Sequence, residues 1–373
     1  MALKIGLVGA RGIGTKHAEC YAQDKSAKLV GVCDVIKERA DALAAQHGVP
    51  AYYRLRDLLD AEPDLLIVDV CTGGLENGSW HFEPVQEALE AGKHVLVEKP
   101  ISHDIHEARQ MVAAAAEKRL YLGCNLNHFF TPTADKAMEY IRGGKVGELV
   151  YCLHKMGFNG GEATYAPLAK RWRFPYSHLK AFLAHPFSVL RYFCGDITHV
   201  QAFLDRPASR RAAGDPMLSI ASIHVRFAGG GVGYLLSQRG DATFGLGGWW
   251  SVEVAGTRGT FCIENCIEKI TYWPQPAPGG AARPEDLAMG ASAGPEVTDT
   301  GITDFGATFA LRLHAFVEDV ANGVPLESLR GSGRDALATL EYTWAAIESY
   351  EQGGALVRPA PLPPLHGDPA TLE

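Results

Sequence analysis

Short apolar runs and amphipathic stretches alternate over the first 124 residues. The apolar runs, rich in Val, Ile and Leu, cover residues 3–8, 28–33, 64–71, 94–97 and 120–124. The stretches with helical periodicity cover residues 35–44, 55–60, 82–91 and 105–118. Short continuous apolar runs are typical of strands that are buried on both faces of a sheet. Their alternation with helices predicts a parallel sheet wound with helices.

A different pattern begins near residue 126. Strand-like runs follow one another at 147–156, 197–205, 217–228, 231–239, 250–256 and 259–264. Gly229–Gly231 separates two of these runs, as a hairpin turn does. Such a series predicts a largely antiparallel open sheet, accompanied by helices over 134–142, 180–195, 305–322 and 334–352. Residues 274–304 are rich in Pro and Gly, which is the composition of an inserted loop.

The pattern and the chain length together predict two domains. A chain of 373 residues is too long for a single core of ordinary size. We expect an α/β domain over residues 1–124, an α+β domain over residues 125–358 and an extended tail over residues 359–373.

The net charge and the spacing of the cysteines argue against several classes of protein. A net charge of −8 argues against nucleic acid as a partner, although backbone amides can still bind the phosphates of a cofactor. The eight cysteines form no CxxC pair, which indicates core residues in a reducing compartment, with neither a disulfide framework nor a metal site. The sequence has no signal peptide and no apolar run long enough to span a membrane. We therefore expect a cytoplasmic protein without a membrane partner.

The strand predicted over residues 94–97 ends in Glu98-Lys99-Pro100. Proline cannot continue a central strand, so the chain must leave the sheet at this point. Ligands of open α/β sheets bind just beyond the carboxyl ends of the strands. Lys99 therefore lies where chemistry occurs in such folds, although from these residues alone it is equally a surface lysine before a turn.

A glycine-rich turn follows the first strand. Gly9, Gly12 and Gly14 are similar to a GxGxxG loop, but Arg11 occupies the place of the middle glycine and Gly12 comes one residue late. Such a loop presents backbone amides to a pyrophosphate at the start of a helix. Asp34 ends the second strand, where an acid accepts hydrogen bonds from the adenosine ribose and repels a 2′-phosphate. We expect NAD rather than NADP, while a helix N-cap is a second, compatible role for Asp34.

The order of these features resembles the Gfo/Idh/MocA oxidoreductases, the relatives of glucose–fructose oxidoreductase and inositol dehydrogenase. The resemblance rests on the glycine loop, Asp34, Cys71-Thr72, Ala91-Gly-Lys-His-Val-Leu-Val-Glu-Lys-Pro100 and Asn125-Leu-Asn-His-Phe. It implies an N-terminal Rossmann NAD-binding domain. It also implies a C-terminal α+β domain with a large, mainly antiparallel open sheet that binds substrate and mediates oligomers.

The resemblance also assigns roles to residues of the first domain. Lys99 becomes an active-site residue beside the nicotinamide, Glu98 helps to shape the site, and the Lys99–Pro100 peptide is expected to be cis. For His81, a structural role within its turn is as well supported as a contact with the ligand. The residues expected to bind the cofactor are Gly9, Arg11, Gly12, Ile13, Gly14, Asp34, Thr72, His81, Glu98, Lys99 and Asn127.

The second-domain helix departs from the family pattern. The family usually has an aspartate and a histidine four residues apart, which face the hydroxyl group that loses its proton. This chain keeps His185 but has Ala181 at the aspartate position. The acid/base group must then be His185 or Lys99, with His178 and Lys180 as candidate helpers. The alternative is that His185 is an inert histidine at the start of a helix.

The turn over residues 72–81 is a second departure, because it is longer than the family's usual turn. We expect it to reshape the entrance for the cofactor or the substrate. Trp80 within it is either an anchor of the loop or a ring that stacks on a sugar. Further candidate substrate contacts are Asn159, Arg171, Trp172 and Arg173.

These residues predict an NAD-dependent oxidoreductase that moves a hydride between nicotinamide and a secondary alcohol or ketone of a sugar, glycoside or inositol-type polyol. Lys99 and His185 are the predicted catalytic residues, which handle the hydroxyl proton. Two alternatives stay open. One is a glycoside or keto-sugar 3-oxidoreductase that lacks the usual aspartate, and the other is a non-catalytic dinucleotide-binding sugar sensor. The second-domain sheet is the expected interface of a homodimer or homotetramer.

Overall fold

The computed structural model describes residues 2–158, 174–242, 245, 247–275 and 294–363. The first sheet consists of β1 (Leu3–Val8), β2 (Ala27–Cys33), β3 (Ala51–Tyr52), β4 (Ile67–Val70), β5 (His94–Val97) and β6 (Leu122–Cys124). The strands lie in the order β3-β2-β1-β4-β5-β6, and every neighbouring pair is parallel. This is the strand order of a Rossmann sheet, which confirms the predicted fold class. The order reverses between β1 and β4, so ligands are expected beyond the ends of these two strands.

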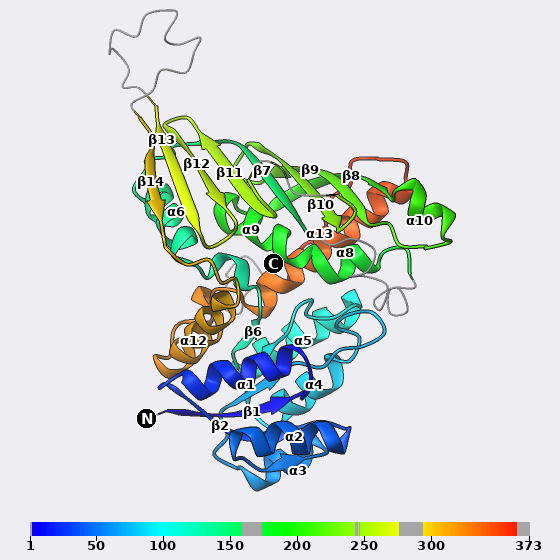
Figure 1. Ribbon diagram of the computed structural model, residues 1–373, viewed down its shortest axis with the longest axis vertical. Helices are drawn as coiled ribbons and strands as arrows, with labels where there is room; N and C mark the ends of the chain where they lie inside the picture. The colour runs from blue at the N-terminus through cyan, green and yellow to red at the C-terminus, as the bar shows by residue number, and fades with distance from the viewer. Residues whose placement is uncertain (1, 159–173, 243–244, 246, 276–293, 364–373) are drawn as a thin grey trace, which may run out of the picture.

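Helices cover both faces of the first sheet (Figure 1). They are α1 (Ile13–Gln23), α2 (Lys37–His47), α3 (Leu55–Ala61), α4 (Phe82–Glu90) and α5 (Ile105–Lys118). Leu7 of β1 and Leu43 of α2 belong to one buried cluster on one face. Val68 of β4 and Leu58 of α3 belong to another cluster, on the opposite face. Both faces of the strands are therefore buried, as their continuous apolar runs predict.

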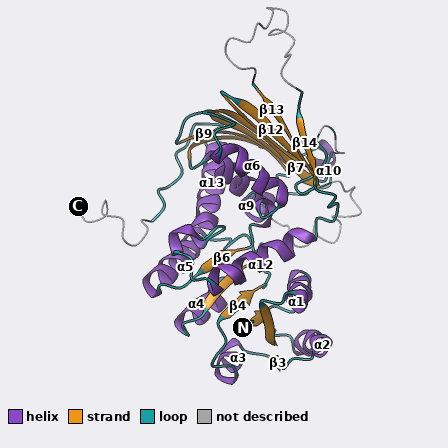
Figure 2. Cartoon of the chain, turned by 90° about the vertical axis from the view of Figure 1, so that its left-hand side faces the viewer, coloured by secondary structure: helices purple, strands orange, loops and turns teal. Residues whose placement is uncertain are grey.

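A helix from the end of the chain completes the first domain. This helix, α12 (Ala307–Ala321), lies beside α1 in both views (Figures 1 and 2). Leu313 and Phe316 of α12 share a buried cluster with Ile5 of β1. Arg312 is fully buried and donates a hydrogen bond to the Cys124 carbonyl at 3.1 Å. Thus α12, which lies within the range predicted for the second domain, packs against the first domain.

The second sheet consists of β7 (Leu149–Phe158), β8 (Ile197–Asp205), β9 (Ile220–Phe227), β10 (Val232–Arg239), β11 (Trp250–Gly256), β12 (Gly259–Glu264), β13 (Lys269–Pro274) and β14 (Glu296–Asp299). The strands lie in the order β14-β13-β12-β11-β7-β10-β9-β8. Among the described strands, β7 and β10 form the one parallel pair of this sheet, and the other neighbours are antiparallel. The predicted mainly antiparallel sheet is confirmed.

Helices lie along one face of the second sheet, and the opposite face is open (Figure 2). The second-domain helices are α6 (Pro132–Arg142), α8 (Ser177–Phe182), α9 (Ala184–Cys194), α10 (Ala208–Ala212) and α13 (Gly333–Glu351), with 3₁₀ turns at η1 (Asn127–Phe129) and η2 (Leu326–Ser328). Along β7, Cys152 and Met156 are buried, whereas Leu153 is exposed. This alternation is typical of a sheet that is covered on one side. Within the described residues, none of the helices has the length and apolar character needed to cross a membrane.

Two elements differ from the sequence predictions. The helix predicted over residues 180–195 is divided at Leu183 into α8 and α9. Pro186 has no N–H to donate to the preceding turn, so one continuous helix cannot form there. Strand β14 lies inside the stretch predicted as a loop over residues 274–304. It is an edge strand with the sequence Glu-Val-Thr-Asp, in which one apolar residue gives no periodic signal.

Candidate active site

The glycine turn between β1 and α1 is shaped by close backbone contacts. A Cβ at Gly14 would lie 1.8 Å from the carbonyl oxygen of Gly9, and Gly12 has a φ of +58°. Gly12 is the N-cap of α1 and provides no side chain to cap it, so no capping side chain competes with a ligand for the first amides of the helix. Arg11, Gly12 and Ile13 are all exposed. The displaced glycine therefore fits the start of the helix, and the turn has the features of a phosphate-binding loop.

Asp34 lies beside this turn at the end of β2. One carboxylate oxygen accepts the Ala10 N–H at 2.9 Å, and the other accepts the Ile36 N–H at 2.8 Å. Ile36, not Asp34, is the N-cap of α2, so the structure corrects the proposed N-cap role. The carboxylate joins the ends of β1 and β2, which is where the ribose of a dinucleotide lies in a Rossmann domain.

Lys99 connects the two domains. It follows β5, and its peptide bond to Pro100 is cis. Its Nζ donates a hydrogen bond to the carbonyl oxygen of Ala181 in α8 at 3.4 Å. Lys99 thus contacts the position at which the family usually has an aspartate, through the backbone. Burial lowers the pKa of Lys99 and the Arg239 cation lowers it further, while the Glu98 carboxylate opposes both.

His185 lies one helical turn after Ala181, in the first turn of α9. Its ring stacks on His128, with the ring centres 3.8 Å apart and the planes 9° from parallel. The indole N–H of Trp250 donates to Nδ1 of His128 at 3.1 Å. Burial, the neighbouring His128 and the Lys99 cation lower the pKa of His185 well below its ordinary value. Among the described residues, Nδ1 of His185 has no hydrogen-bond partner. The result is a buried, neutral imidazole beside Lys99, able to accept a proton.

The long turn over residues 72–81 is fixed against the Lys99–Pro100 turn. His81 is buried, with Nδ1 2.9 Å from the Pro100 carbonyl oxygen and Nε2 2.7 Å from that of Thr72. Burial lowers the pKa of His81, although the carbonyls favour the protonated ring. Both ring nitrogens face the backbone, so the geometry favours the structural role of His81 over a ligand contact.

The same turn reaches the second domain through Glu76. Its carboxylate lies 3.0 Å from Nζ of Lys180, and it accepts the Ser177 hydroxyl at 3.3 Å. Lys180 also lies over the Trp344 ring at 4.9 Å from its centre. Lys180 is therefore directed to the long turn and to Trp344, and not toward the Lys99 amine.

The remaining predicted residues of the first domain lie at the edges of the site. Thr72 donates its hydroxyl to the Trp80 carbonyl at 2.7 Å, and the Trp80 side chain is 59% exposed. The Asn127 amide is buried and donates to the Thr308 hydroxyl at 2.7 Å. This contact holds Asn127 against the start of α12.

His178 occupies the first turn of α8 and is fully buried, with Nε2 3.1 Å from the Ser237 hydroxyl. Burial and the cations of Arg239 and Arg210 lower its pKa well below the ordinary value. The predicted substrate contacts Asn159, Arg171, Trp172 and Arg173 lie outside the described residues.

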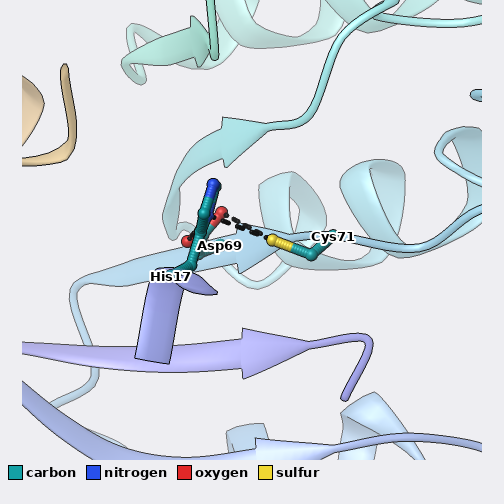
Figure 3. Close-up of side chains that lie close together, drawn as sticks. All are labelled: His17, Asp69 and Cys71. Atoms are coloured by element: carbon teal, nitrogen blue, oxygen red, sulfur yellow. Dashed lines mark hydrogen bonds and ion pairs between the residues drawn. The ribbon is translucent and has the colours of Figure 1, made fainter. Parts of the chain in front are cut away.

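Sequence reasoning missed several residues around Lys99 and Glu98. His128 and Asn125 lie within the Asn125-Leu-Asn-His-Phe motif, but neither was singled out. Figure 3 shows the buried group of His17, Asp69 and Cys71, and Nε2 of His17 lies 3.2 Å from Oε1 of Glu98. The available signal was Asp69, a charged residue inside an otherwise apolar strand, because such a residue needs a buried partner.

Comparison with known proteins shows the family to which this chain belongs. Residues 3–126 match the model of the oxidoreductase family with an NAD-binding Rossmann fold, and residues 134–262 match the Gfo/Idh/MocA C-terminal domain. The chain belongs to the Gfo/Idh/MocA family of oxidoreductases. As in other Gfo/Idh/MocA members, its first domain is an NAD-binding Rossmann domain.

Individual relatives of this Gfo/Idh/MocA chain are sugar and polyol dehydrogenases. Inositol 2-dehydrogenase of Rhizobium meliloti (strain 1021) is 24% identical over 356 residues, which cover 94% of this chain and 97% of that protein. Levoglucosan dehydrogenase of Pseudarthrobacter phenanthrenivorans is 26% identical over 69% of this chain and 72% of that protein. The structure of a levoglucosan dehydrogenase with NADH and levoglucosan has a TM-score of 0.80 at 22% identity, covering 96% of this chain and all of that one. That structure has the same fold.

Proposed function

We propose that this oxidoreductase transfers a hydride from a secondary hydroxyl carbon of a sugar, glycoside or inositol-type polyol to NAD. The observation that carries the proposal is the hydrogen bond from Nζ of Lys99 to the Ala181 carbonyl, one helical turn before His185, together with the effect of the Lys99 charge on the His185 imidazole. The names of the relatives, which are inositol and levoglucosan dehydrogenases, support this substrate class.

The residues of the first domain fit a dinucleotide. The start of α1, which no side chain caps, would hold its pyrophosphate, and Asp34 would accept hydrogen bonds from its ribose. When bound, the nicotinamide supplies the hydride acceptor. The Asp34 carboxylate disfavours the 2′-phosphate of NADP, so NAD is the proposed cofactor.

His185 and Lys99 have different roles toward the substrate hydroxyl. The lowered pKa of His185 keeps the ring neutral, which is the form that accepts the hydroxyl proton, and the same shift makes the ring a weaker base than a free imidazole. The Lys99 ammonium donates a hydrogen bond to the oxygen and stabilises the negative charge that develops there. Lys99 Nζ can exchange its bond with the Ala181 carbonyl for one with the substrate, because a backbone carbonyl carries no competing negative charge.

The test is an activity panel with purified protein. NAD or NADP is mixed with levoglucosan, inositols, alkyl glucosides and keto-sugars, and the change in NADH absorbance is followed. Lys99→Met is expected to abolish turnover and to retain NAD binding. The matched control is Lys93→Met, because Lys93 lies at the surface and donates to the Pro63 carbonyl. Full activity of Lys99→Met would contradict the assignment, and tight NAD binding with no turnover of any polyol would favour a sugar sensor.

We further propose that two copies of the chain meet through the open face of the second sheet. Val232 and Tyr151 lie opposite each other on β10 and β7, and Tyr234 and Leu153 form the next pair on the same face. These side chains surround a hollow of about 500 Å³, and Leu153 and Val232 are about half exposed. An apolar patch of this kind favours association with a second copy. Leu153→Glu is expected to shift the protein toward monomers in sedimentation experiments, and an unchanged oligomeric state would contradict this.

A further inference from the structure

A chain of buried polar groups runs beneath the turn that carries Lys99. His17 of α1 is its central member and is fully buried. Its Nδ1 lies 2.8 Å from Oδ2 of Asp69 on β4, and its Nε2 lies 3.2 Å from Oε1 of Glu98 after β5. The imidazole therefore lies between two carboxylates that belong to neighbouring strands. Figure 3 shows the ring of His17 facing Asp69 and Cys71.

The Asp69 carboxylate is surrounded by hydrogen-bond donors. The Tyr21 hydroxyl donates to Oδ2 at 2.8 Å, and the Cys71 sulfur lies 3.6 Å from Oδ1. Burial and the Asp69 carboxylate raise the pKa of Cys71, so Cys71 is a thiol that can donate. Asp69 is fully buried among these donors, and a buried carboxylate requires hydrogen-bond donors or a nearby cation.

The Glu98 carboxylate is held in the same way on the other side of the ring. Its Oε2 accepts the backbone N–H of Lys99 at 3.0 Å, and its Oε1 accepts the Asn125 amide. Burial acts to raise the pKa of Glu98, but the hydrogen bond and charge of His17 and the Lys99 cation lower it below the ordinary value. Glu98 is thus an ionised group that contacts both His17 and the backbone of Lys99.

The charge of His17 follows from these neighbours. Burial acts to lower the pKa of His17, but the Asp69 carboxylate and its contact with Nδ1 raise it. Because Cys71 is a neutral thiol, the opposing charge at Nδ1 is that of Asp69. Nε2 also lies 3.2 Å from Nδ2 of Asn125, which could donate to a neutral ring. With carboxylates on both sides, the protonated ring, which donates from both nitrogens, is favoured.

We propose that His17 is a positioning residue for Lys99: as a cation between Asp69 and Glu98, it keeps the Glu98 carboxylate ionised and turned toward the Lys99 backbone. The inference deepens the proposed function and rests on it. The Glu98 charge opposes the burial that lowers the pKa of Lys99. Loss of the His17 charge would let Glu98 take up a proton, and the ammonium form of Lys99 would lose its nearest counter-ion.

The distances favour a hydrogen-bonded network over a metal site. Ligand atoms of a tetrahedral zinc site, with bonds of about 2.0 to 2.3 Å, lie about 3.3 to 3.8 Å apart. In this protein Nδ1 of His17 lies 2.8 Å from Asp69 and 3.1 Å from the Cys71 sulfur, which are hydrogen-bond distances. Nδ1 of His17 is therefore already engaged in hydrogen bonds with Asp69 and Cys71.

The first test is the pH dependence of kcat/KM for His17→Gln. Glutamine keeps a donor at this position but cannot carry a charge. If Lys99 acts as an ammonium, the alkaline limb of the profile reports its deprotonation, and this limb is expected to move down by about one pH unit. The matched control is Cys20→Ala, a buried residue one turn later on α1, which is expected to keep the wild-type profile. Asp69→Asn, expected to shift the limb in the same direction, replaces His17→Gln if that variant does not fold.

The second test uses the protein without cofactor or substrate, so that its outcome does not depend on the proposed reaction. In ¹⁵N-histidine NMR spectra, the resonance that His17→Gln removes is expected to show a doubly protonated ring at pH 7. The pH at which Lys99 reaches half its maximal reactivity with an acylating reagent, measured by peptide mass spectrometry, is expected to fall in His17→Gln.

A neutral His17 ring, or unchanged Lys99 reactivity in a folded variant, would overturn the inference. One equivalent of zinc or iron that is present in the wild type and lost in both His17→Gln and Asp69→Asn would also overturn it. If the wild type oxidises no polyol but shows a protonated His17 and the Lys99 shift, the proposed function fails while the positioning role stands.

Discussion

Replacing Glu76 by Gln tests whether the long turn and α8 are coupled by charge. Glu76 and Lys180 lie 3.0 Å apart, and their side chains are only 10% and 15% exposed. At an effective dielectric constant of about 20, two unit charges at this separation attract each other by about 5 kcal/mol. Desolvation of both groups offsets much of this attraction, and removal of one partner from a buried pair costs about 3 to 5 kcal/mol.

The expected loss for Glu76→Gln is smaller than this, for two reasons. Glutamine can still accept hydrogen bonds from Lys180 and from the Ser177 hydroxyl, and Lys180 keeps its contact with the Trp344 ring at 4.9 Å. We therefore expect the free energy of unfolding to fall by about 2 kcal/mol. Such a change is readily measured from the urea midpoint, provided that the slope of the transition is unchanged.

A double-mutant cycle with Lys180→Met isolates the interaction itself. The coupling energy between the two positions is expected to be about 1 to 2 kcal/mol. The control pair is Lys136 and Glu139, which lie closer together at 2.7 Å but are 39% and 66% exposed. Water screens that pair, so its cycle is expected to give no measurable coupling. Equal coupling in the two cycles, or none at Glu76, would refute the argument from burial.

Three further results are expected. Asp34→Asn removes the charge that repels a 2′-phosphate. The ratio of kcat/KM for NADP to kcat/KM for NAD should therefore rise about tenfold, which corresponds to about 1.4 kcal/mol. An unchanged ratio would show that other residues select the cofactor. The acid limb of the kcat/KM profile should lie below pH 6.5, because burial, the neighbouring His128 and the Lys99 cation lower the pKa of His185. The alkaline limb should lie below pH 10.5, because burial lowers the pKa of Lys99. His128→Phe should move the acid limb upward, and limbs at the ordinary values would contradict these assignments. Glu98 has a lowered pKa, so its contribution to folding is present above pH 4.5 and is lost as the pH falls further; Glu98→Gln should weaken the acid dependence of stability measured by urea unfolding.

The fold could be predicted from the sequence wherever the apolar pattern is strong. The buried runs of β1, β2 and β5 mark their own bounds to within a residue. The pattern does not show which helix packs on which sheet, because α12 has the same amphipathic character as the second-domain helices. Its place beside α1 depends on contacts between segments about 300 residues apart, such as that of Asp24 with His314.

The site could be predicted in part, because chain order places Lys99, Asp34 and the glycine turn at the ends of neighbouring parallel strands. The partners of these residues come from distant segments. The stacking of His128 on His185 depends on how η1 packs against α9, and the pairing of His17 with Glu98 depends on how α1 crosses β5. Helical geometry alone does not predict where the Lys180 side chain points, because its direction is set by Glu76, a residue of the other domain.

The position of α12 also has a consequence for synthesis on the ribosome. All strands of the first sheet have been translated when Cys124 is added, but α12 ends at Ala321. At about 5 to 20 residues per second, the intervening 200 or so residues take about 10 to 40 s to translate. During that interval the apolar side chains that α12 covers in the folded protein, among them Ile5 and Leu96, are not covered by it. We therefore expect the nascent NAD-binding domain to need chaperone protection until nearly the whole chain has emerged, and a fragment ending at Cys124 to aggregate when expressed alone.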